Sequence, residues 1–127
     1  MSPVEVTQVC RLFQNLNENK TSLDIPNKLI EIASEPLSIP FTYIYNQSIT
    51  NGIVPDAFKI SKVTPTYKSG EVTDPGNYRP IATISSFSKV LERLIYNQLY
   101  LVLEKKMMFY ININLGLGKA TLPNNLF

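Results

Sequence analysis

The segment Gly52–Pro80, which reads GIVPDAFKISKVTPTYKSGEVTDPGNYRP, decides the predicted fold of this chain. Residues 59–68 within it alternate in chemical character, and this alternation predicts a β-strand with two different faces. Val63, Pro65 and Tyr67 share one face, whereas the other face carries lysines and threonines. Because proline cannot donate a ladder hydrogen bond, the strand is predicted to lie at a sheet edge or in a two-stranded ribbon.

Turn signals follow this strand and predict that the chain reverses direction. Ser69-Gly70 and Asp74-Pro75-Gly76 are typical turn sequences. A brief return strand is expected around residues 78–81. The segment is therefore predicted to form an antiparallel hairpin, preceded by one helical turn at Pro55–Phe58.

Helices are predicted on both sides of the hairpin. Ser2–Glu5 has the spacing of a capping box with proline at the first helical position, and an apolar stripe of helical period follows as far as Leu16. Two further helices are predicted to open at Pro26 and Pro36, and Asn51-Gly52 is a typical helix end. After the hairpin comes the strongest helical pattern of the chain.

Ser85 or Ser86 is the predicted N-cap of this long helix, and its apolar stripe covers residues 87–103. Lysines at positions 105 and 106 suit the negative C-terminal end of a helix. The expected fold class is α+β, mostly helical, with a small antiparallel β-ribbon.

Three segments are expected along the chain. Residues 1–51 form a helical N-terminal extension, and residues 52–110 carry the ribbon and the long amphipathic helix. Beyond Tyr110 the apolar period is lost, so residues 111–127 are expected to form a degenerate, poorly ordered tail.

The composition fits a globular segment and limits its chemistry. The 127 residues carry a net charge of only +2 and contain no histidine and one cysteine, Cys10. An internal disulfide and a Ser-His or Cys-His nucleophilic pair are therefore excluded, and no zinc site is expected. Neither a signal peptide nor an apolar stretch of membrane-spanning length is present, so we expect an intracellular location, cytoplasmic or nuclear, and no membrane partner.

Positive charge in the hairpin makes it the candidate nucleic-acid site. Lysine and arginine neutralise phosphates, and tyrosine can stack on bases. Composition alone favours a plainer interpretation, in which lysines occupy the solvated face of an edge strand. The residues concerned are Lys59, Lys62, Lys68 and Arg79, with Tyr67 and Tyr78 between them.

No catalytic residue and no metal ligand is predicted in this chain. Metal-assisted phosphoryl transfer needs carboxylates that converge on two ions. The ten carboxylates are scattered along the sequence, without an Asp-Asp, Asp-x-Asp or Asp-x-x-Asp pair.

Over the hairpin and the following helix, the chain resembles the reverse transcriptases of non-LTR retrotransposons of the LINE-like, jockey type. The matching elements are TNGIVPDAFKISKVTPTYKSG, residues 50–70, and TDPGNYRPIATISSFSKVLERLIYNQLYLVLEK, residues 73–105. This ordered set of a proline turn, a basic strand, an acidic loop, Asn-Tyr-Arg-Pro-Ile and an amphipathic helix is specific. The resemblance extends more weakly over residues 4–110.

This resemblance implies the N-terminal extension and part of the fingers subdomain of a right-hand polymerase. Arg79 matches the arginine of the family's Tyr-Arg-Pro element and is expected near the incoming triphosphate or the RNA template. Lys62 and Lys68 match basic positions of the preceding strand, and Tyr78 is expected beside them at the same phosphate-binding site. An RNA template or DNA is the implied partner.

In that family the metal-binding aspartates belong to the palm, which would lie beyond Phe127. The resemblance therefore implies a truncated RNA-directed DNA polymerase that is inactive alone. Mg²⁺ is expected only for the full-length parent enzyme, with no cofactor in this chain, and the missing palm is the expected packing partner. Two alternatives stay open: a stand-alone nucleic-acid-binding module derived from the fingers, and a non-functional open reading frame product whose exposed apolar stripes favour aggregation.

Overall fold

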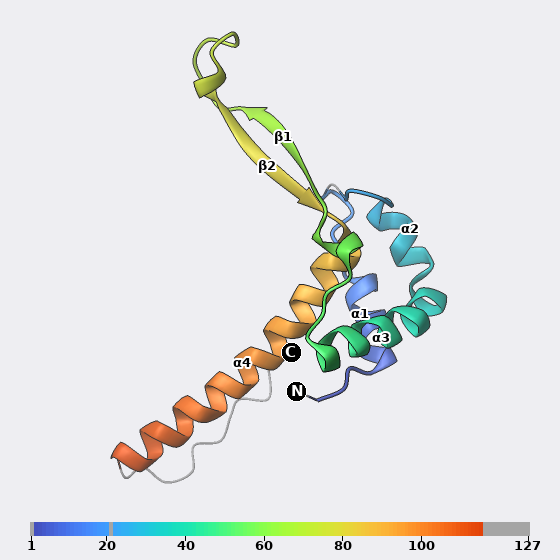
Figure 1. Cartoon of the computed structure of the whole chain (residues 1–127), viewed down its shortest axis with the longest axis vertical. Coiled ribbons are helices and arrows are strands. Elements are labelled where there is room, and N and C mark those ends of the chain that lie inside the picture. The colour runs from blue at the N-terminus through green and yellow to red at the C-terminus, as the bar shows by residue number, and fades with distance from the viewer. Residues whose placement is uncertain (1, 21, 116–127) are drawn as a thin grey trace. The chain divides into compact units, whose positions relative to one another are not determined.

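The computed structural model describes residues 2–20 and 22–115, and only the backbone of residues 112–115. Within this part of the chain, helices dominate and two antiparallel strands form a single small sheet (Figure 1). The predicted α+β class, mostly helical with a small antiparallel ribbon, is confirmed. In chain order the elements are α1 Val6–Gln14, α2 Asn27–Ile32, α3 Ser34–Asn51, η1 Asp56–Lys59, β1 Ser61–Tyr67, η2 Pro75–Asn77, β2 Tyr78–Ile84 and α4 Ser86–Leu115.

The chain divides into two compact units, residues 1–94 and residues 95–127. The first unit contains α1, α2, α3, the hairpin and the first turns of α4. The second unit contains the remainder of α4. The hairpin and the core to which its ends are joined therefore belong to the same unit.

Aromatic side chains from α1, α3 and α4 form the core of the first unit. Phe13 packs edge-on against both Phe41 and Phe87, with ring centroids 5.7 Å apart in each pair. Phe41 and Phe87 stack on one another at 4.1 Å. Such pairs each contribute about 0.5–1.5 kcal/mol beyond the burial of their area, so this cluster holds the start of α4 against α1 and α3.

A buried hydrogen bond strengthens the same contact. The hydroxyl of Tyr45, a fully buried residue of α3, donates to the carbonyl oxygen of Phe87 at 2.8 Å. Burial raises the pKa of Tyr45, so its hydroxyl keeps the proton that it donates. The first turn of α4 is thus fixed by both ring packing and a polar bond.

The N-terminus of α4 has a serine cap, as the sequence predicted. The hydroxyl of Ser85 accepts a hydrogen bond from the backbone N–H of Phe87 at 3.3 Å. The next residue, Ser86, donates from its hydroxyl to the side-chain oxygen of the buried Asn27. Asn27 in turn donates to the carbonyl oxygen of Asn17 at 2.8 Å, which joins the loop before α2 to the start of α4.

The predicted start of the first helix at Ser2–Glu5 is wrong, because α1 begins only at Val6. The cause lies in α3, where the side chain of Asn46 occupies both backbone groups of Val4. The N–H of Val4 donates to Asn46 Oδ1 at 2.7 Å, and Asn46 Nδ2 donates to the Val4 carbonyl at 2.9 Å. Glu5 becomes the N-cap, with its N–H donating to the Gln8 side chain at 3.1 Å.

Gly52 ends α3 as predicted, in a left-handed conformation with φ of +67°. At the other end of the chain, α4 continues to Leu115, past the lysines at which its end was predicted. Of the residues expected to form a poorly ordered tail, 111–115 are helical, and 116–127 lie outside the described residues.

Only the first turns of the apolar stripe on α4 are buried. Val90, Leu91 and Leu94 are at most 5% exposed, whereas Leu99 and Leu103 are 46% and 62% exposed. Cys10 of α1 is half-buried. Within the part of the chain that the structure describes, no helix has the length and apolar character that crossing a membrane requires.

Replacing Phe13 with alanine is expected to lower the free energy of unfolding by about 3–5 kcal/mol, because a fully buried ring is lost and a cavity remains. Urea unfolding followed by circular dichroism measures the change. Tyr43→Ala is the control, since the Tyr43 side chain is 68% exposed on α3 and its loss should change stability by at most about 0.5 kcal/mol. Equal losses in both variants would contradict the assigned core.

Candidate nucleic-acid interface

The hairpin is an antiparallel ribbon whose register is defined along its whole length. Ser61 of β1 lies opposite Ile84 of β2, and the pairing continues residue by residue to Tyr67 opposite Tyr78. Directly opposed residues of an antiparallel pair project to the same face of a sheet, and successive residues alternate between faces. The register therefore assigns every side chain of the ribbon to one of two faces.

One face collects the positive charges predicted from the sequence. Lys62 lies opposite Thr83, and Arg79 lies opposite Thr66. Lys68 continues the same face just beyond β1, where its N–H donates to the carbonyl oxygen of Asn77 at 2.8 Å. We call this surface the basic face, and it comprises Lys62, Thr64, Thr66, Lys68, Arg79, Ile81 and Thr83.

The opposite face is apolar and includes the remaining predicted site residue, Tyr78. Tyr67 and Tyr78 face each other there, with ring centroids 5.8 Å apart in an edge-on arrangement. The structure thus brings Lys62, Lys68 and Arg79 together and separates Tyr78 from them. We call this surface the apolar face, and it comprises Val63, Pro65, Tyr67, Tyr78, Pro80 and Ala82.

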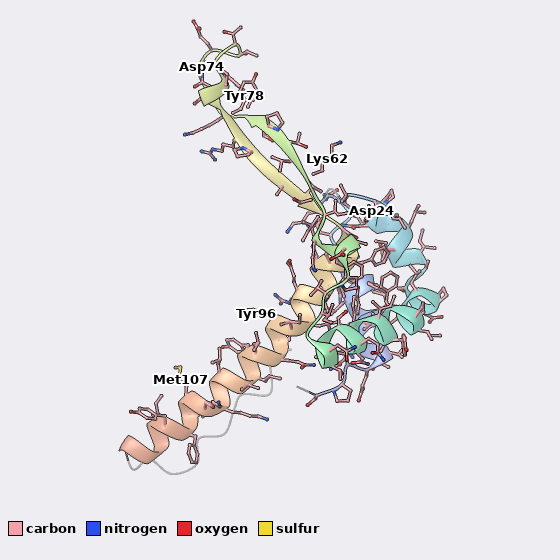
Figure 2. The ribbon with its side chains drawn as sticks, viewed as in Figure 1. Asp24, Lys62, Asp74, Tyr78, Tyr96 and Met107 are labelled. Atoms are coloured by element: carbon pink, nitrogen blue, oxygen red, sulfur yellow. The ribbon has the colours of Figure 1, made fainter. Side chains whose placement is uncertain are left out.

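Both faces of the ribbon are open to solvent. All seven residues of β1 are exposed, and β2 is exposed from Arg79 to Ala82. Figure 2 shows Lys62 toward the end at which the strands join the rest of the chain, and Tyr78 and Asp74 at the loop end. A ligand could therefore reach the basic face along its full length.

The three cations of the basic face are not neutralised within the described residues. No ion pair involving Lys62, Lys68 or Arg79 occurs in this part of the chain. Lys59 differs, because its ammonium group lies 3.0 Å from a carboxylate oxygen of Asp56 in η1. Three of the four hairpin cations that the sequence singled out thus have no ion-pair partner among the described residues and can bind an external anion.

Pro65 and Pro80 face each other in the middle of the ribbon and limit how a further strand could pair with either of its edges. Ladder hydrogen bonds join alternate pairs of an antiparallel ribbon. Since the N–H of Lys68 bonds to Asn77, counting back along the register places Pro65 and Pro80 at a pair without such bonds. The missing N–H groups would point outward there, so the ladder is intact while both outer edges lack a donor.

The loop between the strands is held by the tyrosines of the apolar face. The hydroxyl of Tyr67 donates to the carbonyl oxygen of Gly70, and that of Tyr78 donates to the carbonyl oxygen of Val72 at 2.7 Å. The side chain of Asn77 donates to the carbonyl oxygen of Glu71 at 2.9 Å. The loop is therefore closed by bonds of its own, and both tyrosine hydroxyls are used in closing it.

The base of the ribbon is tied to the core of the first unit. Phe58 of η1 lies three residues before the start of β1, and its carbonyl oxygen accepts a hydrogen bond from the Ser88 hydroxyl of α4 at 2.9 Å. The ring of Phe58 also lies 6.2 Å from that of Tyr45. The two ends of the hairpin are consequently joined to each other and to the buried aromatic cluster.

Sequence reasoning missed part of this site. The hydroxyls of Thr64, Thr66 and Thr83 lie on the basic face and can donate to phosphate or sugar oxygens. The alternation of β1 identified the first two as neighbours of the lysines, but Thr83 falls beyond the return strand that was predicted. In residues 2–20 and 22–115, no three histidine, cysteine, aspartate or glutamate side chains gather into a possible metal site.

Two curated proteins of Drosophila melanogaster are similar to this chain. The RNA-directed DNA polymerase from mobile element jockey is 29% identical over 87 residues, which are 68% of this chain and 9% of that polymerase. The probable RNA-directed DNA polymerase from transposon BS is 28% identical over 102 residues, which are 78% of this chain and 11% of that protein. The chain is a distant relative of these retrotransposon polymerases.

The resemblance to non-LTR retrotransposon reverse transcriptases is thereby confirmed. The chain spans about a tenth of the length of the RNA-directed DNA polymerases that it matches. No family model matches it, and no solved structure does so significantly.

Gly70→Ala is expected to open the loop of the hairpin. Gly70 has φ of +97°, and a Cβ atom there would lie 2.6 Å from the side-chain nitrogen of Asn77. Hydrogen exchange at the Lys68 amide, which bonds to Asn77, should accelerate. Gly52→Ala is the control, because Gly52 also has positive φ but its added Cβ would meet nothing within 4 Å. Unchanged protection of Lys68 in Gly70→Ala would contradict the closed loop.

Proposed function

We propose that the chain forms part of the fingers region of a reverse-transcriptase-type polymerase. In this proposal the basic face of the hairpin contacts the phosphate backbone of an RNA template or of DNA. The observation that carries it is the register, which groups Lys62, Lys68 and Arg79 on one exposed face, where none of the three forms an ion pair with another described residue. The sequence similarity to two RNA-directed DNA polymerases supports the same assignment.

The chemistry of the basic face suits phosphate. Lysine provides a point charge, and the planar guanidinium of Arg79 can donate two parallel hydrogen bonds to phosphate oxygens. Arg79 lies between the two lysines along the ribbon, because its partner Thr66 falls between positions 62 and 68. In the matching family element this arginine is expected near the incoming triphosphate or the template, and we propose that role for Arg79.

Polymerisation itself is proposed to need groups that this chain does not supply. Transfer of a nucleotide requires two Mg²⁺ ions held by converging carboxylates. The spacing of the carboxylates in this sequence contains no paired-aspartate element. We propose that a palm domain provides these ligands and also covers the apolar side chains that α4 exposes beyond Leu94, such as Leu99 and Leu103.

A stand-alone nucleic-acid-binding module is the second candidate function. The observation that favours it is the hairpin loop, which Tyr67, Tyr78 and Asn77 close without help from other elements. Both candidates require binding through the basic face. They differ in whether a palm domain, added separately, restores primer extension.

Replacing Lys62, Lys68 and Arg79 together with glutamine is expected to abolish most of the salt-dependent binding to duplex. Three phosphate contacts predict a slope of about −2.7 in a plot of log affinity against log salt concentration, and the variant should bring it near zero. Fluorescence anisotropy with a labelled RNA–DNA duplex measures the slope. The matched control replaces the exposed Lys20, Lys105 and Lys106 with glutamine, which removes the same charge elsewhere. Equal effects in both variants would overturn the assigned face.

The isolated chain is expected to show no primer extension with Mg²⁺ and all four deoxynucleotides. The reason is the lack of a paired-aspartate element in its sequence. A gel assay on a primed RNA template measures product length, with a complete reverse transcriptase as the positive control. Robust extension by this chain alone would contradict the proposal that a palm domain supplies the Mg²⁺ ligands.

A further inference from the structure

The two faces of the ribbon separate the groups that could bind phosphates from the groups that could stack on bases. Lys62, Lys68 and Arg79 lie on the basic face, whereas Tyr67 and Tyr78 lie on the apolar face. The side-chain period of a strand is two residues, so a tyrosine reaches the basic face only if the register slips by one. Such a slip would also carry the cations of that strand to the apolar face.

The tyrosines are further committed to the loop. Their hydroxyls donate to the carbonyl oxygens of Gly70 and Val72. Turning either ring toward a bound base would break the bond that closes the loop behind it. Neither tyrosine is therefore available as a stacking platform for a nucleic acid held on the basic face.

What the basic face does offer is a set of ligands for the sugar–phosphate backbone. Its cations are separated by the hydroxyls of Thr64, Thr66 and Thr83, and hydroxyls of this kind commonly bond to phosphate and sugar oxygens. Ile81 is its one apolar member. Within the register this face carries no aromatic ring. Asn77, which lies opposite Lys68 at the loop end, donates its side-chain N–H to the carbonyl oxygen of Glu71 at 2.9 Å and is committed to the loop.

Negative charge marks the loop end of this surface. Glu71 and Asp74 are exposed in the loop just beyond Lys68. Asp74 also accepts a hydrogen bond from the Gly76 N–H at 2.9 Å, which keeps its carboxylate at the turn. Phosphates that approach the loop meet repulsion there, so favourable contact ends near Lys68.

The length of the favourable surface follows from strand geometry. Lys62 and Lys68 are six positions apart in the sequence, which is about 20 Å at a rise of roughly 3.3 Å per residue. A stacked nucleic-acid strand advances about 3.4 Å per nucleotide, so this surface covers about six nucleotides.

We infer that the basic face binds the sugar–phosphate backbone over about six nucleotides without stacking on bases or preferring a base sequence, and that the acidic loop ends this footprint. The inference rests on the proposed function, because it specifies how the same face takes nucleic acid. It assigns the two tyrosines a structural role and makes Glu71 and Asp74 determinants of where binding stops.

Abasic oligonucleotides test the first part directly. The affinity of the full chain is measured for 12-nucleotide strands of mixed sequence, of a single repeated base, and of tetrahydrofuran-linked backbone without bases. Backbone binding predicts affinities within about threefold of one another. Stacking predicts a loss of about 5- to 150-fold for each stacked base that is removed. A loss of that size with the abasic strand would overturn the inference while leaving the proposed function intact, whereas no binding to any strand would overturn both.

Neutralising the loop tests the second part. Glu71→Gln combined with Asp74→Asn keeps an oxygen acceptor for the Gly76 N–H and removes both charges. We expect tighter binding and a footprint that extends past six nucleotides in a length series of mixed-sequence strands. The matched control is Asp24→Asn with Glu35→Gln, which removes two exposed charges elsewhere in the first unit. Equal gains in both double variants, or no gain in either, would show that the loop does not limit the footprint.

Discussion

The register of β1 against β2 is the constraint on which the candidate site depends. Because side chains alternate along a strand, a shift by one residue would disperse the cations and bring tyrosines among them. The loop fixes this register from one end, through the bond between Lys68 and Asn77 and the left-handed conformation of Gly70. At the other end, Ser88 bonds to Phe58 and joins the two strand ends. Charge placement in the hairpin is thus a consequence of how both of its ends are closed.

The helical part of the first unit supports the hairpin through the start of α4. The ring of Phe87 stacks on that of Phe41, and the Phe87 carbonyl oxygen accepts a hydrogen bond from the Tyr45 hydroxyl. The Ser86 hydroxyl donates a hydrogen bond to the side chain of the buried Asn27. Since β2 ends at Ile84, immediately before these contacts, the aromatic core determines where the return strand stops. A surface that binds a polymer needs such support, because an isolated two-stranded hairpin is marginally stable in water.

Local sequence signals predicted much of this fold. Proline at position 65 indicated a ribbon of limited width, Gly52 the end of α3, and Ser85 the cap of α4, and each depends on residues close by in the chain. The start of α1 was missed because Asn46, 42 positions away, takes both backbone bonds of Val4. Alternation alone places Tyr78 and Arg79 on opposite faces, because the two residues are consecutive in β2. It does not show which face of β2 joins which face of β1, and the closed loop decides that Arg79 shares a face with Lys62 and Lys68.

The paired prolines also affect the tendency of this chain to aggregate at high protein concentration. Cross-β growth requires an unbroken row of outward N–H and C=O groups along an exposed strand. Pro65 and Pro80 interrupt that row at the same level on both sides of the ribbon. Neither side presents a continuous template for a further copy, even though Val63 and Tyr67 leave an apolar surface open to solvent. The same two residues that narrow the sheet to two strands therefore protect it from templating fibrils.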